Sequence, residues 1–154
     1  MNFKTIFSTD RVYRYTLVRE IGDSDKTLFF LCLNPSTADE IKNDPTVTRC
    51  IGYARDWGYG RLLVGNIFAI RSTDPKLLYK TDDPIGSEND KWIKKMAEHS
   101  DLTVGAWGNH GQLNSRSAQI NKLIPDINCL KITKLGEPSH PLYLSKKLKP
   151  IPFS

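Results

Sequence analysis

The sequence predicts an α/β fold with a central, mainly parallel sheet of four strands. Four short apolar runs are separated by segments of helix length, which is typical of parallel strands joined by helical crossovers. Right-handed crossovers place helices on both faces of such a sheet, which gives three layers. The four runs are Leu28–Leu33, Leu62–Phe68, Leu102–Trp107 and Ile127–Thr133.

The N-terminal segment, about residues 1–26, predicts an antiparallel hairpin that leads into this sheet. Apolar and polar residues alternate from Arg11 to Arg19, as in a half-buried strand. Gly22-Asp23-Ser24-Asp25 then predicts a turn before the strand that begins at Thr27. We therefore expect an N-terminal antiparallel hairpin that feeds the central sheet.

Three helices are expected between the strands. Asp44-Pro45-Thr46 predicts the start of the first, with proline near its first position and a carboxylate at the positive end of the dipole. Gly58-Tyr59-Gly60 ends it. Ser87-Glu88-Asn89-Asp90 predicts a cap for the second helix, which continues to about His99. Ser115–Leu123 predicts the third.

Length and composition predict one domain that spans residues 1–154, because 154 residues with 39% hydrophobic side chains can bury a core. The sequence has no apolar run of membrane-spanning length, and residues 1–10 lack the apolar stretch of a signal peptide. We therefore expect a cytoplasmic protein; its oligomeric state stays open, with a monomer favoured. Pro150 and Pro152 predict an extended tail from about residue 145 to residue 154.

Charge and cysteine content restrict the ligand classes only in part. The net charge of +5, with the basic run Lys146-Lys147-Leu148-Lys149, is compatible with nucleic acid and equally with a solvated surface. The three cysteines lack C-x-x-C spacing, so we expect neither a disulfide framework nor a zinc site. No metal or cofactor is predicted.

Polar motifs accompany all four apolar runs, and an open α/β sheet binds its ligands at the carboxyl ends of the strands. The motifs are therefore expected to lie together at one edge of the sheet. They are Asn34-Pro35-Ser36-Thr37 after the first run, Asn66 within the second, Gly108-Asn109-His110-Gly111 after the third and Gly136-Glu137-Pro138-Ser139-His140-Pro141 after the fourth.

In this order the motifs resemble those of the uracil-DNA glycosylase superfamily. Its members carry an Asp-Pro or Asn-Pro loop after the first strand, an asparagine in the second, W-G-x-H after the third and H-P-S or N-P-S after the last. The resemblance covers about residues 27–144 and implies a glycosylase-like fold. Two further blocks, Leu33–Asp39 and Asp44–Cys50, resemble the bacterial and phage domain-of-unknown-function family 1643.

The superfamily resemblance implies cleavage of an N-glycosidic bond in nucleic acid, by an N-glycosyl hydrolase of the DNA glycosylase type. Asn34 would orient the attacking water, Asn66 would read the edge of the base, and His140 would donate to a base carbonyl oxygen. The other substrate-binding residues would be Pro35, Ser36, Asn109, His110 and Ser139, and Asp44, Arg49 and Arg71 would contact phosphate or sugar.

Most of these side chains also have a structural explanation. Asn-Pro initiates turns, a buried amide such as Asn66 satisfies loop backbone, and His140 could be a histidine of a surface loop. Gly108-Asn109-His110-Gly111 also predicts a tight turn. Asp44 and Arg49 could cap a helix and form a local ion pair.

The last motif can be aligned in two registers, which place either Glu137 or His140 at the position of the superfamily histidine. Tyr143 or Leu144 would then be the side chain that penetrates DNA. The first motif has no carboxylate to act as a general base. Two other functions therefore stay open: an enzyme that acts on free nucleotides or modified bases, and a non-catalytic module that binds a base or nucleic acid.

Overall fold

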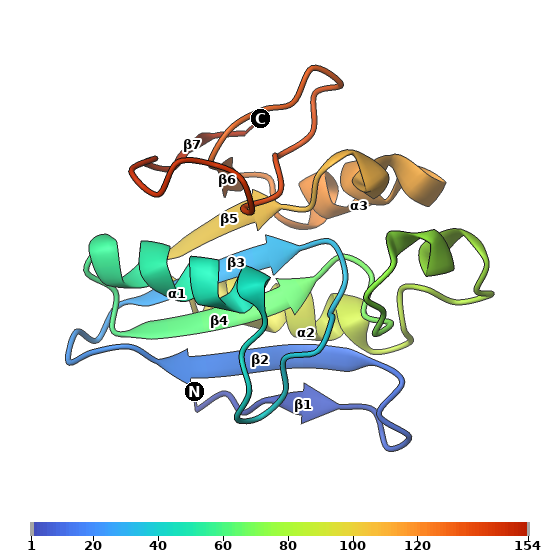
Figure 1. Cartoon of the computed structure of the whole chain (residues 1–154), viewed down its shortest axis with the longest axis horizontal. Helices are drawn as coiled ribbons and strands as arrows, with labels where there is room; N and C mark the ends of the chain where they lie inside the picture. Colours follow the sequence, from blue (N-terminus) through green and yellow to red (C-terminus); the bar gives the residue numbers. More distant parts are fainter. Residues whose placement is uncertain (1, 154) are drawn as a thin grey trace.

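The computed structural model describes residues 2–153 and contains one mixed sheet with helices on its two faces (Figure 1). The α/β class is confirmed, and the sheet has seven strands in the order β1-β2-β4-β3-β5-β6-β7, where four central strands and an N-terminal hairpin were expected. The strands are β1 (Ile6–Phe7), β2 (Arg14–Glu20), β3 (Thr27–Cys32), β4 (Arg61–Asn66), β5 (Leu102–Ala106), β6 (Asn128–Cys129) and β7 (Ile151–Pro152).

The four predicted runs supply the parallel part of the sheet, β4-β3-β5-β6. Cys32 at the end of β3 lies opposite Asn66 at the end of β4 and Ala106 at the end of β5. Three parallel strands therefore end at the same level, and the segments that follow β3 and β5 leave the same edge of the sheet. Of the additional strands, β2 pairs antiparallel with β4 and β7 with β6, which satisfies backbone groups at the outer strands of the parallel part, and β1 pairs with β2.

An antiparallel hairpin is present in the N-terminal segment, formed by β1 and β2, and it joins the parallel strands through β4. β2 pairs antiparallel with β1 on one side and with β4 on the other, so β4 lies between β2 and β3. The chain reaches β3 by crossing the start of β4, where the amides of Ile21 and Gly22 both donate to the Gly60 carbonyl. A Cβ at Gly60 would lie 1.7 Å from the Ser24 carbonyl oxygen, so glycine is required for this crossing.

Helices cover both faces of the sheet. α1 (Pro45–Asp56) lies in front of the sheet in Figure 1 and α2 (Asn89–Glu98) lies behind it. α3 (Arg116–Leu123) follows β5, and two short 3₁₀ helices, η1 (Pro75–Tyr79) and η2 (Asn109–Ser115), were not predicted as helices.

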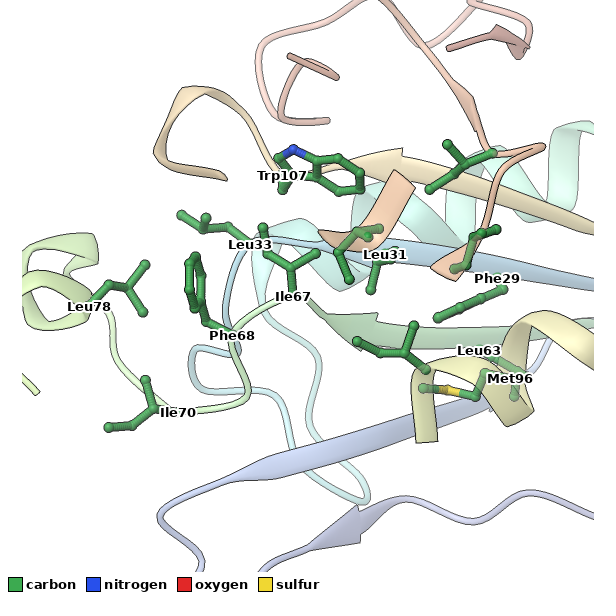
Figure 2. Close-up of a cluster of buried hydrophobic side chains, with 14 of the residues drawn as sticks. Phe29, Leu31, Leu33, Leu63, Ile67, Phe68, Ile70, Leu78, Met96 and Trp107 are labelled. Atoms are coloured by element: carbon green, nitrogen blue, oxygen red, sulfur yellow. The ribbon is translucent and has the colours of Figure 1, made fainter. Parts of the chain in front are cut away.

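Each face of the sheet has its own apolar cluster, because successive side chains of a strand point to opposite faces. Phe30 and Val104 pack with the buried side of α1. Phe29 belongs to the other cluster, with Met96 of α2 and Ile120 of α3. Figure 2 shows that second cluster, which extends from Phe29 and Met96 to Phe68 and Leu78 and includes Trp107.

The helix starts agree with the sequence in one case and differ in the other. Asp44 caps α1, and its Oδ1 accepts from the amide of Val47 at 2.9 Å. No side-chain cap is formed at the start of α2, so that prediction is wrong. Asn89 is instead fully buried and donates through Nδ2 to the carbonyls of Asn66 and Ile67, which joins the start of α2 to the end of β4.

The C-terminal tail is attached to α1 by three hydrogen bonds before it forms β7. The donors stand four residues apart on the helix, so they follow one side of it. Each donates to a backbone carbonyl of the tail, and the pairs are Arg49 with Leu144, Tyr53 with Ser145 and Trp57 with Leu148. No helix within residues 2–153 has the length and apolar character needed to cross a bilayer.

Candidate functional site

A cleft of about 540 Å³ lies where β3 and β5 end. The segments after these strands, the loop before α1, the loop before η1 and the last motif all contribute to its walls. The polar residues that line it are Asn34, Ser36, Asp44, Thr46, Ser72, Thr73, Asn109, His110 and His140. A polar cleft at this edge is the position that the strand order predicts for a ligand site.

Asn34 is half-buried in this cleft and holds two loops together. Its Nδ2 donates to the carbonyl of Pro35 at 3.2 Å and to the carbonyl of Ser72 at 3.0 Å. Both bonds use the amide nitrogen, so Oδ1 has no donor within residues 2–153. The side chain therefore presents an acceptor oxygen from a fixed position.

Asp44 brings a buried carboxylate to the same cleft, although only 6% of the residue is exposed. Its two oxygens accept from the amides of Val47 and Ala38, at 2.9 and 3.3 Å. It forms no ion pair with Arg49, whose guanidinium donates to the Leu144 carbonyl. The carboxylate that the first motif lacks is thus supplied from the start of α1.

His140 is held in one tautomer at the cleft. Its Nδ1 accepts from the amide of Leu142 at 3.3 Å, so a neutral ring carries its proton on Nε2. Burial lowers the pKa of His140 below its usual 6.5, and the negative charge of Asp44 opposes this only in part. At neutral pH the side chain is therefore an uncharged N–H donor.

Gly108 fixes how the last motif approaches β5. Its amide donates to the Pro138 carbonyl at 2.7 Å, and its Cα lies close to His140, whose Cβ would be 3.8 Å from a Cβ at this position. Gly108 has φ +75°, a conformation that side chains other than glycine rarely adopt. The backbone conformation, and not a lack of space beside His140, therefore favours glycine at this position.

Asn66 lies deeper than the other predicted residues and does not line the large cleft. It lines a recess of about 20 Å³ that shares five residues with the cleft, so the two spaces adjoin. The shared residues are Asn34, Ser36, Asp44, Thr46 and His140. Only 2% of Asn66 is exposed.

Arg14 is a part of this site that the sequence did not predict. It is 2% exposed, lines the recess, and donates to the Ala38 carbonyl and to Asn66 Oδ1, both at 3.1 Å. Burial lowers the pKa of Arg14 to about 10, against the opposing effect of the Asp44 charge. Its position in an alternating strand resembles that of an exposed polar residue, so the sequence has no signal for its burial.

Glu137, the other candidate in the last motif, faces the interior. Its Oε1 accepts from Trp107 Nε1 at 2.9 Å and from Ser117 Oγ at 2.6 Å. Ser139 also lines neither the cleft nor the recess, and its amide donates to the Lys131 carbonyl. Of the two registers, the one that uses His140 places an imidazole in the cleft.

The remaining predicted residues divide between the rim and other surfaces. Asn109 and His110 are exposed at the rim, where they bond to Thr133 and Tyr79. Pro35 lines the recess, and Arg49 lines a neighbouring groove. Arg71 lines neither the cleft nor the recess, because its guanidinium turns to the Arg11 carbonyl and the Phe7 ring.

The described part of the chain offers no group of three or more histidine, cysteine or acidic side chains able to hold a metal ion. Asn34, Asp44 and His140 present an amide oxygen, a carboxylate and a neutral N–H donor to the cleft. All three lie within residues 14–142, the region that matches the profile of one family, described as protein of unknown function (DUF1643). The chain belongs to the DUF1643 family. No curated protein and no solved structure matches it.

The match to DUF1643 confirms the closer of the two resemblances. It also includes every residue that lines the cleft, from Leu33 to Leu142, and begins at the buried Arg14. The cleft is therefore built entirely from the part of the chain that the family shares, whereas the tail beyond Leu142 lies outside the match.

Proposed function

We propose that this DUF1643 protein binds a nucleobase in the cleft and hydrolyses its N-glycosidic bond. The observation that carries the proposal is the meeting of a neutral imidazole, His140, a buried carboxylate, Asp44, and an amide oxygen, Asn34, in one cleft. A cleft of about 540 Å³ is of the size that binds small ligands. The glycosylase-like order of the motifs supports the same reaction.

In the proposed reaction a water oxygen bonds to the anomeric carbon while the carbon–nitrogen bond to the base breaks. The bonding electron pair leaves with the base, and His140 Nε2–H stabilises the negative charge on its carbonyl oxygen. The Asn34 oxygen orients the water, and the Asp44 carboxylate accepts its proton. This assignment replaces a water activated by Asn34 alone, which would be a weaker base.

A second groove favours a base that is part of a nucleic acid over a free nucleotide. This groove, of about 670 Å³, shares Asp44, Pro45 and Leu142 with the cleft, and its charged lining has three basic residues, Arg49, Arg55 and Lys146, and two carboxylates, Asp44 and Asp56. The three basic residues would lie along the phosphates on one side of the bound base. Tyr143, next to Leu142, is 99% exposed with φ +69°, and could stack on a neighbouring base.

The test is a panel of single-stranded and duplex oligonucleotides with normal and modified bases, together with the corresponding free nucleosides. Binding and release of the base are measured for the wild type and for Asn34→Ala. We expect Asn34→Ala to reduce binding or release of the preferred member at least tenfold, a loss of about 1.4 kcal/mol. Asn2→Ala removes the same amide from an exposed position that lines neither space, and should change nothing.

Binding that weakens strongly with added salt would support the nucleic acid over the free nucleoside. Binding without release of the base would show that the protein recognises a base and does not cleave its N-glycosidic bond. If no member of the panel binds or reacts, the proposal is wrong.

A further inference from the structure

The recess beneath the cleft has unsatisfied polar groups and a very small volume. Among residues 2–153, Asn66 Nδ2 has no acceptor, because the only side-chain bond of Asn66 is the one its Oδ1 accepts from Arg14. Arg14 Nε is buried and also lacks a partner in the described chain. A buried donor such as Arg14 Nε carries a free-energy cost unless something accepts from it.

Arg14 determines which end of the Asn66 amide faces the recess. A guanidinium can only donate, so Asn66 must turn its oxygen towards Arg14 and its NH₂ group away from it. The positive end of the amide therefore points into the recess from one side. The Asp44 carboxylate lines the recess as well and supplies an acceptor there.

Together these groups favour a ligand that can both accept and donate hydrogen bonds. A volume of about 20 Å³ is enough for one water, which needs roughly 10–15 Å³ and two to four polar partners, and it is too small for a base ring. A water can accept from Asn66 Nδ2 and donate to Asp44. An isolated carbonyl oxygen would satisfy the first group only.

We infer that the recess holds one ordered water, oriented by Arg14 through Asn66, and that a ligand in the cleft meets Asn66 through this water. The inference rests on the proposed function for its second half only. It makes Arg14 a positioning residue, and it replaces the expected direct contact between Asn66 and the edge of the base.

The first test is a crystal structure of the full chain without ligand, at a resolution that orders individual waters. We expect one water within about 2.7–3.2 Å of both Asn66 Nδ2 and an Asp44 oxygen. Asn66→Leu removes the amide and fills the recess, so this water should be lost. Asn66→Asp keeps a polar group there and should retain it. A recess closed by a side chain, or occupied by an ion, would overturn the inference.

The second test is a crystal structure of a complex with the preferred base among uracil, thymine, cytosine, adenine and guanine, with binding compared between the wild type and Asn66→Leu. A direct contact would place an atom of the base within hydrogen-bonding distance of Asn66 Nδ2. With a bridging water the base contacts the water and stays outside the recess, and Asn66→Leu, which removes the water, should weaken binding two- to tenfold. A base atom seated in the recess would refute the bridging water.

The two proposals can fail separately. If the water is present and none of the five bases binds, the water site stands and the proposed function falls. If a base binds and touches Asn66 directly, the function stands and this inference falls. Arg14→Lys, which keeps the positive charge but loses the planar guanidinium group, provides a third test. It should shift or remove the water while the fold is kept, as checked by the unfolding midpoint.

Discussion

Two polar clusters lie at the same end of the sheet, and they differ in how many of their polar groups are hydrogen-bonded within the described chain. Around Glu137, one carboxylate oxygen accepts from Trp107 and Ser117, and the Glu137 amide donates to Thr133. Around His140, several donor and acceptor atoms of the cleft and the recess have no partner in the described chain. Satisfied groups stabilise the fold, whereas unsatisfied groups in a cleft are available to a ligand.

The difference is instructive because the two clusters belong to one short motif. Glu137 and His140 are three residues apart, and the sequence alone could not decide which of them is the site residue of this motif. Their surroundings separate them: Glu137 is 6% exposed beneath Trp107, and His140 lines the cleft. The variants below test whether one cluster serves stability and the other serves binding.

The largest effect is expected for Glu137→Ala. The substitution leaves Trp107 Nε1 and Ser117 Oγ without their acceptor in the interior, and a lost buried acceptor costs roughly 1–3 kcal/mol for each donor. We expect the free energy of unfolding to fall by about 3 kcal/mol, measured by urea denaturation.

Glu137→Gln is the matched control for this variant. It keeps a carbonyl oxygen that can accept from both donors, so its loss should be clearly smaller than that of Glu137→Ala. Equal losses for the two variants would show that the charge of Glu137 matters and that its hydrogen bonds do not.

An intermediate, pH-dependent effect is expected for His140→Gln. Burial lowers the pKa of His140 in the folded protein, so the unfolded chain binds the proton more readily. The contribution of His140 to stability is therefore complete above pH 6.5, the unfolded value, and is lost as the pH falls through the lower folded value. Between these limits the wild type should lose stability more steeply than His140→Gln.

The measurement is the urea midpoint of both proteins from neutral to acid pH. Parallel curves for the wild type and His140→Gln would contradict a neutral, buried imidazole. His99→Gln provides a matched control, because His99 is exposed at the end of α2 and lines neither the cleft nor the recess.

The parallel strands could be predicted from the sequence because their signal is local. Each is a short apolar run between polar segments, and the start of α1 is marked by Asp44-Pro45. The neighbour of β2 could not be predicted in this way. It depends on the crossing at Gly60, where the 21–26 segment meets a strand that begins about forty residues later.

The candidate site shows the same division between local and long-range information. The strand-end rule placed Asn34, Asn109, His110 and His140 at one cleft. The rule does not say how deeply a side chain lies below the surface. Asn66 was therefore expected beside these residues, and it lies instead in the recess. Arg14 was missed altogether, because its burial depends on contacts with Ala38 and Asn66, from two other parts of the chain.

The smallest effect on stability is expected for Ser36→Ala, which is therefore the sharpest test of an unsatisfied cluster. Ser36 is half-buried and lines both the cleft and the recess, yet its hydroxyl has no hydrogen bond to any residue from 2 to 153. Removing it should change the free energy of unfolding by less than about 0.5 kcal/mol, because no protein partner is lost. If the hydroxyl contacts the ligand, affinity for the preferred base should fall two- to tenfold in the same variant. A stability loss above about 1 kcal/mol would place Ser36 with Glu137 as a structural group, and the division between the two clusters would fail at this residue.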